Sequence, residues 1–551
     1  MTMTAAGRSA AATSAFSRQR SRFVALVISG LFTVVAAQLV WLAASADRDT
    51  GARISMITAE PATNVARPDI VDRHGRLLAT DVQVPSLAAD PGLVFDADET
   101  AEKLAQVLPD LDAKTLRKSL GDRKRFVWVR RALSPRLAQK IHNLGLPGIF
   151  LRDEVRRTYP SGRIGGHVLG QVDIDNKGLT GLERWLDAAR GIETVHAARL
   201  STKAPLRLSL DVGVSHAVED ELEAAIVRYD AKAAAGIVMD ASSGEVVASV
   251  SLPGVDPMLG VEVRDPDRID RVNGGVYELG SVLKLMTIAM ALEQGKSPES
   301  LVDTTAPLRL GRYEIADLHP LGRPMSVSEV FIHSSNVGAG LLALEAGADR
   351  QRGFLQRLGL LDAIDTELGT SPRPLVPDHF GRTEQVTIAY GHGLAVTPLQ
   401  LVAATAGLIN GGRAVRPTFV ARDDAAPAGG PKLVGADTSR RLRDLMRLNV
   451  TDGAGTGRRA DVPGYDVGGK TGTAEIAAKG GYRKKSVISS FLGAFPMSAP
   501  RYVTLVMLFE PRGVAATDGE VTAGRNAAPT TARIVARIAP LLGVAAAVPG
   551  G

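Results

Sequence analysis

The chain has 551 residues, no cysteine and a formal net charge of +6, from 65 Lys and Arg against 59 Asp and Glu. The length suggests two to four domains, and 45% hydrophobic with 23% charged residues excludes a mostly disordered chain. The lack of cysteine excludes a disulfide scaffold, thiolate metal sites and a cysteine nucleophile.

The amino terminus predicts a membrane anchor. Residues 1–22 have arginine as their only charged side chain, and residues 23–44 form an uninterrupted apolar run. A helix of about 20 residues crosses a bilayer, and the arginines favour a cytoplasmic tail with the rest of the chain exported. A cleaved signal peptide is the alternative, because Ala44-Ser45-Ala46 has the shape of a cleavage site, but the run is longer than is usual for such a peptide. Without the tail the charge is near +2, so we expect no nucleic-acid partner.

The region 47–205 is expected to form the first exported domain. Residues 67–79 read as two strands joined by a turn at His74-Gly75. Helical spacing of apolar residues covers 99–120 and 134–144. A glycine-rich loop is expected over 156–170, and STKAP at 201–205 is typical of a linker.

The region 206–545 is expected to form a second, larger domain. Its predicted elements, in chain order, are a strand at 206–211, a helix at 212–229, a hairpin at 235–251, a helix at 281–293, strands at 487–495 and 502–509, and a closing helix at 529–542. This order indicates an α+β fold, with an antiparallel sheet flanked by helices.

A serine and a lysine three residues apart form the first candidate for catalysis, Ser281-Val282-Leu283-Lys284. A serine is a weak nucleophile until a base removes its proton, and residues i and i+3 share one face of a helix. The Lys284 amine can therefore reach the Ser281 hydroxyl. To act as its base, this amine must be partly neutral, which burial and a nearby cation promote. Taken alone, the same motif also fits an ordinary solvated helix start.

Two further motifs each occur once. Ser334-Ser335-Asn336 offers a hydroxyl and an amide, although a helix cap would look the same. Lys470-Thr471-Gly472-Thr473, read as an edge strand, offers a cation and hydroxyls for a carboxylate, and Gly472 allows close backbone approach. A backbone N–H of Thr473 is suited to an oxyanion hole. The alternative for this motif is a surface turn.

Residues 464–471 also satisfy the phosphate-loop pattern G-x-x-x-x-G-K-T. That site requires a strand before the loop and a helix directly after it. Gly472 follows at once and Pro463 breaks a preceding strand, so we set the nucleotide interpretation aside.

The order S-x-x-K, S-x-N, K-T-G within one domain is the signature of penicillin-interacting serine acyl-transferases. From about Arg67 to Phe509 the chain resembles class B penicillin-binding proteins, and among them the cell-division (septal) peptidoglycan D,D-transpeptidases of the FtsI type. The first exported domain then resembles their pedestal, or dimerisation-type, domain. Other stretches that carry the resemblance are 67–79, 157–183, 390–400 (YGHGLAVTPLQ) and 461–474 (DVPGYDVGGKTGTA).

The resemblance implies a role for each motif. Ser281 attacks the D-Ala–D-Ala carbonyl of a stem peptide, Lys284 accepts its proton, and β-lactams acylate the same serine. Ser334 relays a proton to the leaving D-alanine, and Asn336 holds the donor peptide. The K-T-G residues Lys470, Thr471 and Thr473 bind the terminal carboxylate, and the oxyanion hole is formed by the N–H groups of Ser281 and Thr473.

The resemblance also implies a setting: a single-pass protein of the bacterial cytoplasmic membrane with its catalytic domain in the periplasm. It implies no cofactor or metal, and as partners the lipid bilayer, an FtsW-type glycosyltransferase and other cell-division proteins. Three alternatives stay open. They are an elongation-type transpeptidase, a β-lactamase, which needs a water-activating residue, and a non-catalytic β-lactam sensor or scaffold.

Five positions depart from the family pattern without removing a catalytic atom. They are Leu279 for proline, Val282 for threonine, His74 for asparagine, His392 for tyrosine and Glu475 for glutamine.

Overall fold

A computed structural model describes residues 26–38, 67–121, 124–188, 204–260, 265–422, 429–478 and 481–547. The chain divides into two compact units, Met1–Asn64 and Val65–Gly551. Residues 26–38 are helical. Within the described ranges, no helix is both long enough and apolar enough to cross a membrane. The tail 1–22, both ends of the predicted anchor 23–44, the Ala44-Ser45-Ala46 site and residues 201–203 of the predicted linker lie outside those ranges.

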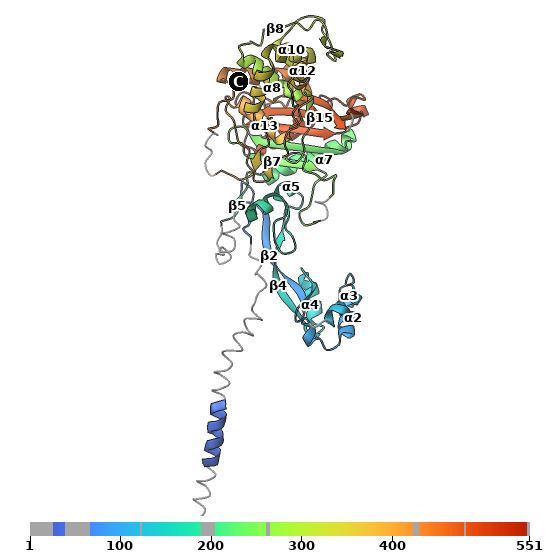
Figure 1. Cartoon of the computed structure of the whole chain (residues 1–551), viewed down its shortest axis with the longest axis vertical. Helices are drawn as coiled ribbons and strands as arrows, with labels where there is room; N and C mark the ends of the chain where they lie inside the picture. Colours follow the sequence, from blue (N-terminus) through green and yellow to red (C-terminus); the bar gives the residue numbers. More distant parts are fainter. Residues whose placement is uncertain are drawn as a thin grey trace, which may run out of the picture. The chain divides into compact units, whose positions relative to one another are not determined.

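The second unit contains a five-stranded sheet in which every pair of neighbours is antiparallel (Figure 1). The strand order is β14 (Gly468–Ala478), β15 (Gly481–Phe495), β16 (Tyr502–Phe509), β6 (Ala233–Asp240) and β7 (Val246–Leu252). The prediction of an α+β fold with an antiparallel sheet is therefore confirmed. The hairpin of β6 and β7 and the pair of β15 and β16 occupy the predicted places.

Both faces of this sheet are covered by helices, because its central strands β16 and β6 carry mainly apolar residues that point to either face. In β6, Ala235 and Ile237 belong to one buried core and Ala234 and Val238 to the other. This alternation follows from the two-residue period of a strand. The helices α7 (Val212–Tyr229) and α15 (Ala527–Leu541) pack on the second core, and Figure 1 shows α7 beside the sheet. On the first core, α13 (Pro398–Ile409) and α14 (Ala436–Thr451) contact the sheet, and α8 (Lys284–Glu293) packs against α14.

A group of four helices that contact α8 was not predicted, and neither were three pairs of short strands. The helices are α9 (Val327–Ile332), α10 (Asn336–Ala346), α11 (Ala348–Arg357) and α12 (Arg382–Tyr390). The paired short strands are β8 (Leu301–Val302) with β11 (Met325–Ser326), β9 (Leu308–Leu310) with β10 (Tyr313–Ile315), and β12 (Asp365–Thr366) with β13 (Gly369–Thr370).

The amino-terminal part of this unit has a sheet of its own. It contains β1 (Ile70–Val71), β2 (Leu77–Ala89), β3 (Val127–Arg130), β4 (Ile149–Thr158) and β5 (Leu206–Arg207). The predicted pair of strands around the His74-Gly75 turn is confirmed as β1 and β2. A separate apolar core lies between this sheet and the helices α2 (Ala97–Val107), α3 (Ala113–Leu120) and α4 (Pro135–His142).

Two predictions for this part were wrong in detail. The helix expected over 99–120 is two helices, α2 and α3, because Pro109 lies between them and cannot continue a helix. The loop expected over 156–170 is shorter, because β4 continues to Thr158 and Gly166–Leu169 form the helical turn α5.

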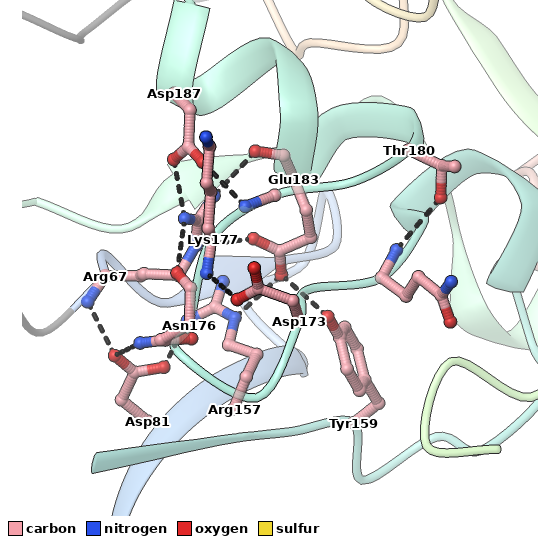
Figure 2. A network of polar contacts seen from close by, with 12 residues as sticks. Arg67, Asp81, Arg157, Tyr159, Asp173, Asn176, Lys177, Thr180, Glu183 and Asp187 are labelled. Carbon is pink, nitrogen blue, oxygen red and sulfur yellow. Dashed lines mark hydrogen bonds and ion pairs between the residues drawn. The ribbon is translucent and has the colours of Figure 1, made fainter. Parts of the chain in front are cut away.

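A buried ion network joins the two stretches 67–79 and 157–183. Glu183 is fully buried and accepts hydrogen bonds from Arg67 Nε (2.8 Å), Arg157 Nε (2.7 Å) and the Tyr159 hydroxyl (3.2 Å). Figure 2 shows these three side chains converging on Glu183. Asp81 adds a second acceptor for Arg157 at 3.2 Å. The two arginines thus remain paired although they are removed from water, which is the condition for burying a charge.

Candidate active site

Ser281 lies on a tight turn in front of α8. The structure places it in the 3-10 turn Gly280–Leu283, so the α-helix predicted from Ser281 begins three residues later, at Lys284. Gly280 has a φ of +61°, and a Cβ added there would lie 2.7 Å from the carbonyl oxygen of Thr473. Glycine is therefore required both by the turn and by the contact with β14. Ser281 itself is half-buried, and Lys284, one turn later, is fully buried.

Lys284 joins the first two motifs. Its Nζ donates to Oδ1 of Asn336 at 2.7 Å, to Oγ of Ser334 at 3.1 Å and to the carbonyl oxygen of Ser334. Ser334 lies between α9 and α10, and Asn336 is the first residue of α10. Ser334 has a φ of +60°, a left-handed conformation that costs a non-glycine residue about 1–2 kcal/mol.

The surroundings of Lys284 favour its neutral form. Burial lowers the pKa of Lys284 well below its ordinary value, and the nearby Lys470 charge lowers this pKa further. The carboxylate of Asp317 acts in the opposite direction. A lysine with a lowered pKa can accept a proton near neutral pH, which is the property required of a base beside Ser281.

The K-T-G motif lies on the edge strand β14, as the sequence predicted. Lys470 is fully buried, and this burial lowers its pKa to about 7. Its Nζ donates to Oγ1 of Thr456 at 3.3 Å and to Oγ1 of Thr471 at 3.4 Å. The same Nζ lies 5.8 Å from the centre of the Phe331 ring, on α9. The motif thus places a cation and two hydroxyls together.

Gly472 and Thr473 press against the turn that carries Ser281. A Cβ on Gly472 would lie 2.3 Å from the carbonyl oxygen of Leu279. Ser490, on the neighbouring strand, donates to the carbonyl oxygens of Gly472 (3.2 Å) and Leu279 (3.4 Å). The Thr473 hydroxyl accepts from the N–H of Ala523 at 3.1 Å. The backbones of Thr473 and Gly280 are therefore neighbours, as an oxyanion hole between Ser281 and Thr473 requires.

All eight predicted site residues thus lie around one place, although 189 positions separate Ser281 from Lys470 in the chain. The phosphate-loop pattern at 464–471 enters the strand β14 directly, and no helix follows it. His392 follows α12; burial lowers its pKa, the charge of Glu278 raises it, and the charge of Lys284 lowers it further.

Sequence reasoning missed two residues beside the K-T-G motif. Thr456 accepts from the Thr471 hydroxyl at 2.8 Å as well as from Lys470. Asn449, fully buried on α14, holds Thr456 through its Oδ1 (3.2 Å) and donates to the carbonyl oxygen of Gly469 at 2.8 Å. Neither residue belongs to a recognisable motif, and only the fold brings them to β14.

Sequence reasoning also missed Asp317, which follows β10. Its carboxylate accepts from the N–H groups of Asn336 (2.5 Å) and Val337 (2.9 Å) and from the Ser335 hydroxyl (2.6 Å). These donors stand at the amino terminus of α10, where N–H groups lack partners within the helix.

Known protein families match both domains of this chain. Residues 234–536 match the model of the penicillin-binding protein transpeptidase domain, and residues 62–188 match that of the penicillin-binding protein dimerisation domain. The chain is 38% identical over 492 residues to the probable peptidoglycan D,D-transpeptidase FtsI of Caulobacter vibrioides, covering 87% of this chain and 82% of that protein. It is 32% identical to the probable peptidoglycan D,D-transpeptidase PenA of Neisseria gonorrhoeae (83% and 82% covered). It is 30% identical to the peptidoglycan D,D-transpeptidase FtsI of Escherichia coli K12 (84% and 82% covered).

Proposed function

Because the chain belongs to the penicillin-binding protein transpeptidases, as a class B member with an amino-terminal dimerisation domain, we propose that it cross-links peptidoglycan stem peptides through an acyl-serine on Ser281. The observation that carries the proposal is the buried amine of Lys284, held at 2.7 Å from Asn336 and 3.1 Å from the Ser334 hydroxyl, one turn after Ser281. A reactive serine needs this kind of base.

In the first step the Ser281 Oγ forms a bond to the carbonyl carbon of the penultimate D-alanine, and its proton passes to Lys284. The carbon–nitrogen bond then breaks, and terminal D-alanine leaves with that proton, relayed through Ser334. In the second step an amine of a neighbouring stem peptide forms a bond to the ester carbonyl carbon and loses a proton to the same base. The bond between that carbon and Ser281 Oγ then breaks, and the base returns the proton to Ser281 Oγ. The product is a cross-link, and the serine is restored.

The substrate carboxylate is proposed to bind at the K-T-G motif. Lys470 supplies the positive charge, and Thr471 and Thr473 supply hydroxyls. The backbone N–H groups of Ser281 and Thr473 stabilise the oxyanion, which is the largest single contribution in many acyl transfers. The close approach of Gly280 and Gly472 to the facing backbone supports this arrangement.

The setting of the reaction is also a proposal. Residues 1–22 form a cytoplasmic tail, 23–44 a membrane-spanning helix, 47–205 the pedestal and 206–545 the transpeptidase domain in the periplasm. We propose a role in septal cell-wall synthesis, which the relatives named FtsI support. An FtsW-type glycosyltransferase is proposed as a partner on the family resemblance alone. Depletion in the source bacterium tests this role: filamentous cells are expected, and rounded cells would indicate elongation instead.

The reaction is tested with the full-length chain and uncross-linked glycan strands that carry pentapeptide stems. We expect release of D-alanine and formation of cross-linked peptide dimers, both abolished in Ser281→Ala. Benzylpenicillin hydrolysis is measured in the same samples. Rapid hydrolysis without cross-linking would identify a β-lactamase. Normal cell division supported by Ser281→Ala would show that the protein acts as a scaffold.

A further inference from the structure

The carboxylate of Asp317 binds the loop that carries Ser334 and Asn336. Its Oδ1 accepts from the N–H groups of Asn336 (2.5 Å) and Val337 (2.9 Å), and its Oδ2 accepts from the Ser335 hydroxyl (2.6 Å). Ser335 in turn accepts from the N–H of Gly338 at 2.9 Å, as the N-cap of α10. One carboxylate and one hydroxyl therefore serve three N–H groups at the amino terminus of this helix, where negative charge is favoured by the helix dipole.

These hydrogen bonds to Asp317 determine where the partners of Lys284 lie. The backbone N–H of Asn336 donates to Asp317, and the side-chain Oδ1 of Asn336 accepts from Lys284 Nζ at 2.7 Å. Ser334 directly precedes the residues that bind Asp317. Its backbone is left-handed, with a φ of +60°, and both its carbonyl oxygen and its hydroxyl oxygen face Lys284. A non-glycine residue keeps this conformation only when its surroundings hold it.

Asp317 also acts on Lys284 through its charge. Two charged groups bear on Lys284: Asp317, from the segment after β10, and Lys470, from β14. Lys284 in turn acts on His392, which lies in the loop after α12. Asp317 is the acidic member of this set. Its negative charge raises the pKa of Lys284, whereas burial and the Lys470 charge lower it. Removal of that charge would extend the neutral form of Lys284 to lower pH.

We propose that Asp317 is a positioning residue of the active site, which holds the Ser334–Asn336 loop against Lys284 and tunes this base through its charge. The inference rests on the proposed function and deepens it, because it names a residue outside the three motifs on which acylation depends. Asp317 makes no contact with the reacting atoms in this account and acts only through Ser334, Asn336 and Lys284.

The experiment compares Asp317→Asn and Asp317→Ala with the wild-type chain, using fluorescent penicillin and the rate of Ser281 acylation between about pH 5 and pH 9. Asp317→Asn keeps the shape and loses the charge, so the acidic limb of the profile moves to lower pH. Asp317→Ala also frees the loop, and misplacement by about 1 Å lowers the acylation rate about 10²-fold. The control is Asp303→Asn, an exposed aspartate in the same region that caps only its neighbour Thr305. It should leave both rate and profile unchanged.

Thermal unfolding of each variant separates positioning from stability. Wild-type acylation rates in both Asp317 variants, or an unchanged acidic limb in Asp317→Asn, would overturn the proposal. Unfolding of both variants at room temperature would overturn it as well, since the role would then be one of stability. Failure of the proposed function gives a different result, because the wild-type chain would then not be acylated on Ser281 and both proposals would fall.

Discussion

The Nζ atom of Lys284 lies 2.7 Å from Oδ1 of Asn336, fifty-two residues further along the chain. This hydrogen bond joins the helix that follows the nucleophile to the helix that begins with the S-x-N motif. Because Lys284 is fully buried, its amine has the oxygens of Ser334 and Asn336 as acceptors in place of bulk water. Several measurable consequences arise from this geometry.

Replacement of the proposed base should slow acylation and leave the fold intact. Lys284→Met keeps an unbranched side chain and removes an amine whose burial is costly. We expect the rate of acylation by penicillin to fall about 10²–10⁴-fold, with no loss of thermal stability. Stopped-flow measurement with fluorescent penicillin checks the rate. A variant that reacts within tenfold of wild type would show that another group takes the proton.

The lowered pKa of Lys470 predicts that the second-order acylation constant decreases at alkaline pH. Burial lowers its pKa to about 7 in the free enzyme, and only the protonated form attracts a carboxylate. The second-order acylation constant should therefore fall as the pH rises above about 7. The rate at saturating penicillin should not show this decrease, because the bound carboxylate keeps Lys470 protonated. A second-order constant that stays level up to about pH 9 would contradict the role of Lys470.

Thr456 should matter for carboxylate binding although it lies outside the three motifs. Its hydroxyl touches Lys470 Nζ at 3.3 Å and Thr471 Oγ1 at 2.8 Å. Thr456→Val keeps the shape, and the loss of these hydrogen bonds should lower the second-order acylation constant about tenfold. Thr451→Val is the control, because this exposed residue ends α14 and its hydroxyl bonds only within that helix. Equal second-order acylation constants in Thr456→Val and Thr451→Val would show that Thr456 does not contribute to carboxylate binding.

The buried network of the pedestal should be important for stability. Glu183→Gln removes the anion shared by Arg67 and Arg157, both buried. The loss of one partner from a buried ion pair costs about 3–5 kcal/mol of unfolding free energy. Glu223→Gln, whose pair with Arg163 is about half exposed, should cost less than about 1 kcal/mol. Chemical denaturation measures both losses of unfolding free energy. Similar losses in Glu183→Gln and Glu223→Gln would contradict a stabilising role for the buried network.

The sequence predicts the motifs of this site better than it predicts their surroundings. Ser281 and Lys284 are three residues apart, so local geometry alone joins them. Strands such as β6 and β16 were predictable because their apolar runs are buried on both faces. The small helices around α8 lack such a signal, and the split between α2 and α3 was missed although Pro109 marks it.

Asp317 and Thr456 were not predictable for a different reason. Each acts on a motif that lies 14 to 19 positions away, through a loop whose course depends on the packed core. The 3-10 turn at Ser281 likewise depends on a tertiary contact, the approach of Gly280 to Thr473 on β14. The membrane span, the domain boundaries and the roles of the site residues remain predictions.

The identity of the acylated atom tests the central claim most directly. The full-length chain is incubated with benzylpenicillin, denatured and digested with trypsin, and the modified peptide is sequenced by mass spectrometry. The account predicts one penicilloyl group per chain, on Ser281 in the peptide 272–284, and no adduct in Ser281→Ala. An adduct on any other residue, or an unmodified and folded wild-type chain, would contradict it.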